Sequence, residues 1–166
     1  VEVEFLAPKE VKLARNKPKL LPGFRVLQAD ACGAAFKAPQ QLALKGKTVR
    51  GANNTVHLRV ASVADFLVMK AHAIGGRDKP KDSYDLCYCL DQFEGGLESL
   101  AADWRVQRGE KVFAKAIGIL HEKFADVNAF GPQQVVEFHN SADGDEKAMQ
   151  ARRAYELVQR FLILAG

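Results

Sequence analysis

The spacing of apolar residues changes near residue 61, and this change constrains the fold more than any other feature of the sequence. Before it, short segments with the two-residue alternation of β-strands are separated by turns rich in Gly and Asn. After it, apolar residues recur every three or four positions, as on one face of an α-helix. The sequence therefore predicts an α+β fold, a small antiparallel β meander followed by a C-terminal helical bundle.

The expected strands are short and most of the expected helices are longer. Strands are expected at 1–6, 24–27, 34–36, 41–44, 48–50 and 56–60. Helices are expected near 63–74, 80–93, 97–102, 109–124 and 145–164, while 133–138 fits either a strand or a short helix. On this basis residues 1–60 form the end of a β-sheet region and residues 61–166 a helical region, together one compact unit.

Composition narrows the class of protein. The chain has 166 residues, 48% of them apolar and 27% charged, so it can bury a core and is not expected to be disordered. A net charge of +4 is compatible with nucleotide or RNA binding without establishing either. Three cysteines without C-x-x-C spacing favour a cytoplasmic protein, and the absence of an apolar run of roughly 20 residues argues against a membrane span.

Lys70 is the first residue that indicates a functional site. At helical spacing it shares a face with Leu67 and Ile74. A lysine within an apolar stripe extends its amine to solvent, pairs with a carboxylate or lies at a pocket. The pattern by itself leaves these three alternatives open.

Two carboxylates, Asp82 and Asp85, follow in the first turn of the next expected helix. Acidic residues there commonly complement the helix dipole. That explanation suits Asp82 poorly, because it lies four residues before Leu86 on an apolar stripe. If a tight loop folds the two helices back on each other, Lys70 and Asp82 come within reach, and a partly buried ion pair is costly unless function retains it.

Glu2 and Glu4 share one face of the opening strand, because side chains alternate between faces. Two carboxylates on one strand face are a common way to hold Mg²⁺, which prefers oxygen ligands. The alternative is an exposed face of an edge strand. By contrast, the D-x-D stretch at Asp143 and Asp145 precedes a helix in a polar loop and is interpreted as an N-cap.

Three segments together resemble the AbiEii/AbiGii-type nucleotidyltransferases of the polymerase-β-like superfamily. They are V-E-F-L-A-P at 3–8, L-R-V-A-S-V-A-D-F-L-V-M-K-A at 58–71 and R-D-K-P-K-D-S-Y-D-L at 77–86. The resemblance covers about residues 1–100. It implies magnesium-dependent transfer of a nucleotidyl group from a nucleoside triphosphate to an acceptor, which is RNA in the characterised toxins. Because many such proteins are toxins of bacterial toxin–antitoxin pairs, it also implies a cognate antitoxin.

The resemblance divides the site into three kinds of residue. Carboxylates hold metal, the metal aligns phosphates, and a cation offsets developing charge. The implied metal ligand is Glu4, and Glu2 is a second candidate because it shares the same strand face. The implied catalytic residues are Lys70, Asp82 and Asp85, and the cations beside the nucleotide are Arg77 and Lys81.

The sequence departs from the family pattern at two points. The Gly-Ser turn and D-x-D strand that supply two further metal carboxylates are absent, and Glu4 stands where Asp is usual. Since the sequence starts inside a strand without Met, we expect the C-terminal part of a longer enzyme, inactive alone. Two alternatives remain: a catalytically inactive module that binds RNA or protein, and a structural domain in which Lys70 and Asp82 form only a core ion pair.

A basic connector follows the opening strand. Its cations are Lys9, Lys12, Arg15, Lys17 and Lys19. They are expected to be a solvated charge run or, alternatively, a contact for the phosphates of an acceptor near the site.

Overall fold

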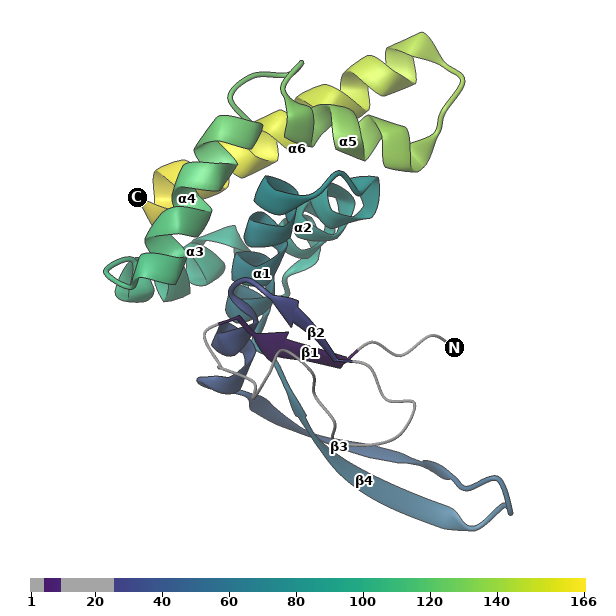
Figure 1. Cartoon of the computed structure of the whole chain (residues 1–166). Coiled ribbons are helices and arrows are strands. Elements are labelled where there is room, and N and C mark those ends of the chain that lie inside the picture. Colours follow the sequence, from purple (N-terminus) through teal and green to yellow (C-terminus); the bar gives the residue numbers. More distant parts are fainter. Residues whose placement is uncertain (1–4, 10–25) are drawn as a thin grey trace. The chain divides into compact units, whose positions relative to one another are not determined.

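The computed structural model of the chain describes residues 5–9 and 26–166 (Figure 1). The chain divides into two units, Val1–Phe66 and Leu67–Gly166. Strands lie in the first unit and helices dominate the second, so the α+β fold class predicted from the sequence is confirmed.

The first unit contains two separate pairs of strands. β1 (Phe5–Pro8) pairs in parallel with β2 (Val26–Ala29). A short 3-10 helix, η2 (Cys32–Phe36), follows β2. β3 (Gln40–Lys47) and β4 (Asn53–Val60) then form an antiparallel hairpin, the one antiparallel pair in the part of the first unit that the structure describes.

The turn of the β3–β4 hairpin is closed by main-chain contacts. Thr48 donates its N–H to the Ala52 carbonyl at 2.8 Å, and Gly51 donates to the Thr48 carbonyl at 2.8 Å. Gly51 has φ of 82°, a conformation that glycine adopts without strain. The strands pair in register from Gln40 opposite Val60 to Lys47 opposite Asn53.

Helix α1 (Val63–Gly76) is capped at its start by Ser62, which also bonds to the side chain of Asp65. The backbone N–H of Asp65 donates to Ser62 Oγ at 3.1 Å, and Ser62 Oγ donates to Asp65 Oδ2 at 2.7 Å. This arrangement satisfies one of the orphan donors at the start of the helix.

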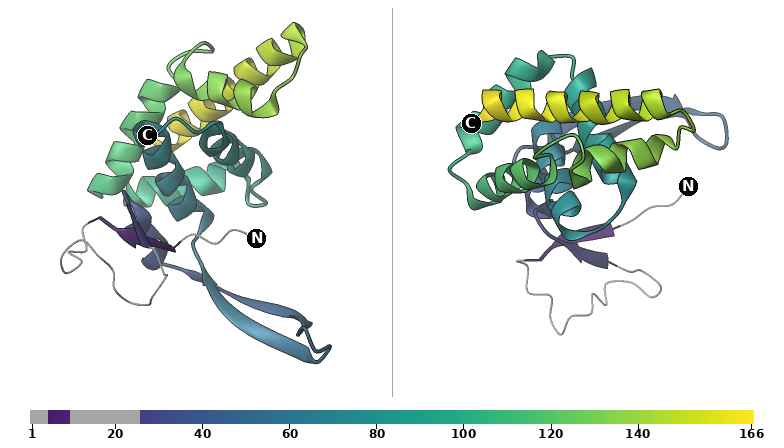
Figure 2. Two further views of the ribbon diagram at one scale, coloured as in Figure 1. Left: turned by 45° about the vertical axis from the view of Figure 1, so that its right-hand side comes forward. Right: turned by 90° about the horizontal axis from the view of Figure 1, so that it is seen from above.

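Six helices make up most of the described chain after residue 62. After α1 they are α2 (Pro80–Gln92), α3 (Gly96–Gln107), α4 (Lys111–Lys123), α5 (Phe130–His139) and α6 (Gly144–Ala165). The long α6 contacts α2, α3, α4 and α5, and Figure 2 shows it running along the helical unit. Asp143 caps α6 by accepting hydrogen bonds from the N–H groups of Asp145 and Glu146 at 2.8 and 3.2 Å, as expected.

The core of the helical unit is built around Trp104. Its ring meets Phe113 and Phe161 edge to face, with centroids 5.5 and 5.0 Å apart, and all three side chains are fully buried. Such aromatic pairs add to the stabilisation from burial itself. Within this unit His72 links α1 to α4, since its Nε2 lies 3.0 Å from the carbonyl oxygen of Val112 at the start of α4.

Two short segments differ from their sequence-based predictions. Residues 34–36 lie in η2 rather than a strand, and residues 48–50 lie in the hairpin turn. A run of three residues is too short for alternation to specify a strand against local turn chemistry. The ambiguous segment 133–138 belongs to α5, where Pro132 is accommodated in the first turn because its missing N–H would have no helical acceptor there.

Across residues 5–9 and 26–166, no helix combines the length and apolar character needed to span a membrane.

Candidate functional site: an ion-pair cluster around Lys70

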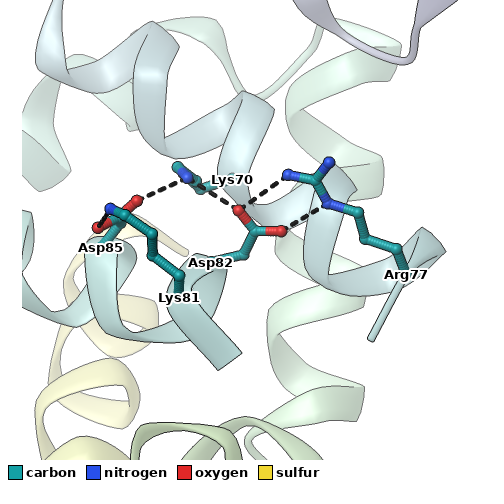
Figure 3. Close-up of polar contacts among 5 residues, drawn as sticks. All are labelled: Lys70, Arg77, Lys81, Asp82 and Asp85. Carbon is teal, nitrogen blue, oxygen red and sulfur yellow. Dashed lines mark hydrogen bonds and ion pairs between the residues drawn. The ribbon is translucent and has the colours of Figure 1, made fainter. Parts of the chain in front are cut away.

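A cluster of five charged side chains lies where α1 is followed by α2, within the helical unit (Figure 3). We call it the Lys70 cluster; its members are Lys70, Arg77, Lys81, Asp82 and Asp85. Lys70 comes from α1, Arg77 from the loop at 77–79, and the other three from the first turns of α2. Pro80 begins α2, because its fixed φ and missing N–H suit the first helical position.

Lys70 bridges the two carboxylates. Its Nζ lies 2.8 Å from Asp82 Oδ1 and 2.7 Å from Asp85 Oδ2. The predicted approach of Lys70 and Asp82 is therefore confirmed. The side chains of Lys70, Asp82 and Asp85 are only 16%, 2% and 17% exposed, so all three charges are largely removed from water.

An outer cation binds each carboxylate from the solvent side. Arg77 donates from Nε to Asp82 Oδ2 at 2.7 Å and from Nη2 to Asp82 Oδ1 at 3.0 Å, a bidentate pair. Lys81 Nζ lies 2.6 Å from Asp85 Oδ1, one helical turn away. The side chains of Arg77 and Lys81 are 53% and 55% exposed, and Figure 3 shows them on either side of Lys70.

The contacts hold all three inner groups in their charged forms. Burial lowers the pKa of Lys70, but the hydrogen bonds to Asp82 and Asp85 outweigh it and raise that pKa above its usual value. Burial raises the pKa of Asp82, but hydrogen bonds from Arg77 and Lys70 lower it overall. Asp85 follows the same pattern, with Lys70 and Lys81 as the groups that lower its pKa. The cluster therefore stays ionised at neutral pH.

The formal charge of the Lys70 cluster is positive, because three cations surround two carboxylates. A divalent metal ion needs carboxylate oxygens that are not already neutralised, and here both carboxylates are engaged by cations. The cluster does not fit a magnesium site. Its surplus charge and two half-exposed outer cations instead suit an anion such as a phosphate group.

The described residues offer neither a metal-binding cluster of His, Cys, Asp and Glu nor a reactive thiol at Cys87. No group of three or more His, Cys, Asp or Glu side chains with metal-ligand spacing occurs among residues 5–9 and 26–166. Cys87 is unsuited to nucleophilic chemistry, since burial, with a smaller effect of Asp91, raises its pKa to about 12.

The predicted site residues are thus brought together in part. Lys70, Asp82, Asp85, Arg77 and Lys81 meet in one cluster, while the predicted metal ligands Glu2 and Glu4 lie outside the described residues. Most of the basic connector lies outside them as well. Its first residue, Lys9, pairs with Asp30 at 3.0 Å.

The sequence-based search missed an aromatic hollow on another side of α2. This hollow, of about 390 Å³, lies between α2, α5 and α6, and no member of the Lys70 cluster lines it. Tyr84 stacks on Phe138 with ring centroids 4.1 Å apart, and Tyr88 lies 5.9 Å from Tyr84. The available signal was two tyrosines spaced one helical turn apart, but side chains at that spacing are neighbours on any helix, so the spacing does not indicate a ligand.

Comparison with known proteins gives a match to a family model. Residues 32–158 match the family model described as "Nucleotidyl transferase AbiEii toxin, Type IV TA system". The match contains all five members of the Lys70 cluster and covers well over half of the chain. No curated protein and no solved structure matches the chain.

Proposed function

Because the chain belongs to the AbiEii nucleotidyl transferase toxin family, we propose that it transfers a nucleotidyl group from a nucleoside triphosphate to an RNA acceptor. The family is one of toxin–antitoxin systems, so a cognate antitoxin is the implied counterpart. The observation that carries the proposal is the Lys70 cluster, whose positive charge and exposed outer cations are suited to the phosphates of a nucleotide.

In this proposal Lys70 is the fixed charge of the site. Nucleotidyl transfer needs positive groups that are already in place when charge develops on the phosphate oxygens and on the pyrophosphate leaving group. The two carboxylates hold the Lys70 ammonium at 2.7 and 2.8 Å, so it needs little rearrangement during the reaction. Its raised pKa keeps the charge present across the physiological pH range.

Arg77 and Lys81 are proposed to contact the nucleotide directly. Their side chains are more than half exposed, and each now binds a carboxylate that also binds Lys70. Either cation can therefore turn toward a phosphate without leaving Asp82 or Asp85 unpaired. Lys70 keeps both carboxylates paired while Arg77 or Lys81 moves from its carboxylate to a phosphate.

Magnesium enters the proposal through the family resemblance, with Glu4 and Glu2 as its ligands. When bound there, Mg²⁺ would hold phosphate oxygens and offset their charge. The carboxylates of the Lys70 cluster are not proposed as ligands, because cations already occupy their oxygens.

The competing interpretation is that the cluster only stabilises the fold. The near-complete burial of Asp82 and its three hydrogen bonds favour this alternative, since such a carboxylate can connect α1 to the loop and α2 without any catalysis. A catalytically inactive module that binds RNA or protein would also retain such a cluster.

The test is transfer of radiolabelled nucleotides to total RNA by the full-length protein with magnesium chloride, comparing wild type with Lys70→Met. We expect the variant to lose activity by on the order of a hundredfold, as for other preorganised electrostatic groups. The matched control is Lys115→Met, which removes an exposed lysine from α4. Full activity in Lys70→Met would exclude the proposed role, and the absence of transfer by the wild type would favour the inactive module.

A further inference from the structure

The charges of this chain are divided unequally between its two units. Residues 1–66 contain eleven Lys and Arg against five Asp and Glu, a formal charge of +6, whereas residues 67–166 contain thirteen against fifteen, a formal charge of −2. The net charge of +4 is therefore the sum of a strongly basic first unit and a slightly acidic helical unit. Such asymmetry is typical of chains that meet nucleic acid with one part of their surface.

The β3–β4 hairpin lies in the longest segment without a negative charge. Residues 31–64 contain five Lys and Arg and not one Asp or Glu. A random run of 34 residues at the average composition of this chain would carry about four carboxylates. Their absence leaves the cations of the hairpin without acidic neighbours in sequence.

The two faces of the hairpin differ in character. Side chains alternate between faces, and the register places Leu42 opposite Leu58 and Leu44 opposite Val56 on one face. The other face, which we call the basic face, carries Lys45, Lys47, His57 and Arg59. The apolar side chains Leu42, Leu44, Val56 and Leu58 are themselves 40–48% exposed, so exposure does not distinguish the two faces. The basic face is the one whose charges suit a polyanionic partner.

The basic face presents its charges in an extended row. Lys45 and Lys47 are two residues apart on β3, about 7 Å along the strand. Arg59 lies opposite Gln41, so the row extends over about 20 Å from that pair to Lys47. Lys45, Lys47 and Arg59 are all exposed, and in the part of the chain that the structure describes none of them forms a salt bridge.

We propose that the basic face of the β3–β4 hairpin binds the phosphate backbone of the RNA acceptor. The proposal rests on the RNA acceptor of the proposed function and assigns the surface that holds it. Lys and Arg side chains in a row match the repeated negative charges of a nucleic acid strand, and each phosphate contact releases bound counterions. The hairpin needs no pocket for such binding.

The residues of the basic face also limit what it recognises. Apart from the imidazole of His57, it has no aromatic side chain on which a base could stack, and its remaining positions are Gln41, Ala43, Asn53 and Thr55. Contacts to phosphate position a nucleic acid without reading its sequence. We therefore expect the hairpin to hold structured RNA of any sequence, while the choice of the reacting nucleotide is made elsewhere.

The test measures binding of a fluorescently labelled stem–loop RNA with a single-stranded 3′ end to the full-length protein, without nucleotide. The test variant is the triple substitution Lys45→Gln, Lys47→Gln and Arg59→Gln. We expect its affinity to fall by roughly tenfold to a hundredfold at 0.1 M salt, and the slope of log K against log salt to decrease by about 2 to 3. Binding equal to that of the wild type would overturn the proposal.

A matched control removes the same number of charges from the helical unit. Lys111, Lys115 and Arg152 are exposed, and their triple substitution to Gln changes the net charge equally. We expect this control to keep at least half of the wild-type affinity. An equal loss in both variants would show that only total charge matters and would overturn the proposal. Displacement of the RNA by polyglutamate as effectively as by unlabelled RNA would also overturn it, in favour of an acidic protein partner.

The binding assay separates this inference from the proposed function. Lys70→Met is expected to retain RNA binding while losing nucleotidyl transfer, and the triple hairpin variant to lose RNA binding. If the wild type binds RNA through the hairpin but transfers no nucleotide, the inference stands and the proposed reaction fails. If transfer to RNA persists with normal affinity in the hairpin variant, the reaction stands and the inference fails.

Discussion

Lys70 and Asp82 form an ion pair across twelve positions of sequence, with Nζ of one 2.8 Å from Oδ1 of the other. Each of these two charged groups also has a second partner of opposite charge. Asp82 is also bound by Arg77, and Lys70 is also bound by Asp85. This sharing decides how the cluster responds when a single member is removed.

Lys70→Met is expected to change the free energy of unfolding by no more than about 1 kcal/mol. Asp82 keeps its bidentate contact with Arg77, and Asp85 keeps Lys81, so neither carboxylate is left buried without a cation. Methionine has nearly the length of lysine and suits the apolar stripe. Urea unfolding of both proteins measures the change, and a loss above about 3 kcal/mol would instead support the core ion-pair interpretation.

The two carboxylates are expected to differ in their contribution to stability. Asp82→Asn should destabilise by about 2 to 4 kcal/mol, because the Asp82 side chain is 2% exposed and accepts hydrogen bonds from both Lys70 and Arg77. Asp85→Asn should destabilise by about 1 kcal/mol, since its side chain is 17% exposed and one of its partners, Lys81, can return to solvent. The same urea experiment compares them, and equal losses would contradict the asymmetry.

The stabilisation that Asp82 and Asp85 contribute to the fold is expected to be lost at acidic pH. The folded-state pKa values of Asp82 and Asp85 are lowered, so their contribution is complete above the unfolded-state pKa of about 4 and is lost as pH falls through the folded-state values. The raised pKa of Lys70 places the loss of its contribution on the alkaline side, above its unfolded-state pKa of about 10. The stability difference between wild type and Asp82→Asn should therefore be constant from about pH 5 to 9 and shrink below about pH 4. A difference that stays constant down to pH 2 would contradict this reading of the cluster.

The inner part of the site could be predicted from the sequence because its charges interrupt apolar stripes. Lys70 and Asp82 each lie where a helix face would otherwise be apolar, and burial without a partner is too costly for either. The pairing of Arg77 and Lys81 with the same carboxylates could not be predicted in this way. Their side chains are half exposed, and exposed charges leave no pattern that fixes their direction.

The fold likewise has parts that could be predicted from the sequence and parts that could not. The two strands of the β3–β4 hairpin could be predicted in part, because apolar residues alternate at Leu42 and Leu44 on one strand and at Val56, Leu58 and Val60 on the other. The position of the turn could not, since residues 48–50 lie in it although the sequence predicts a strand there. Residues 34–36 lack such support. Ala31, with φ of 60°, precedes η2, and no sequence pattern predicts an alanine with a left-handed backbone conformation.

Two glycine-to-alanine substitutions are expected to have opposite effects on stability. Gly118 lies inside α4, and a Cβ there would meet no atom within 4 Å. Gly118→Ala should therefore raise the free energy of unfolding by about 0.5 to 1 kcal/mol, because alanine loses less backbone entropy in a helix. A Cβ on Gly131, in the first turn of α5, would lie 2.4–2.7 Å from ring atoms of Phe124.

Gly131→Ala should lower the free energy of unfolding by about 1 to 3 kcal/mol, as other overpacked sites do. The Phe124 ring is fully buried and cannot swing into solvent to make room, so α5 or the ring must shift. Parallel urea titrations of the two variants give both values from one experiment, with Gly118→Ala as the control for the general effect of alanine in a helix. If Gly131→Ala proved as stable as Gly118→Ala, the close approach of α5 to Phe124 would be wrong.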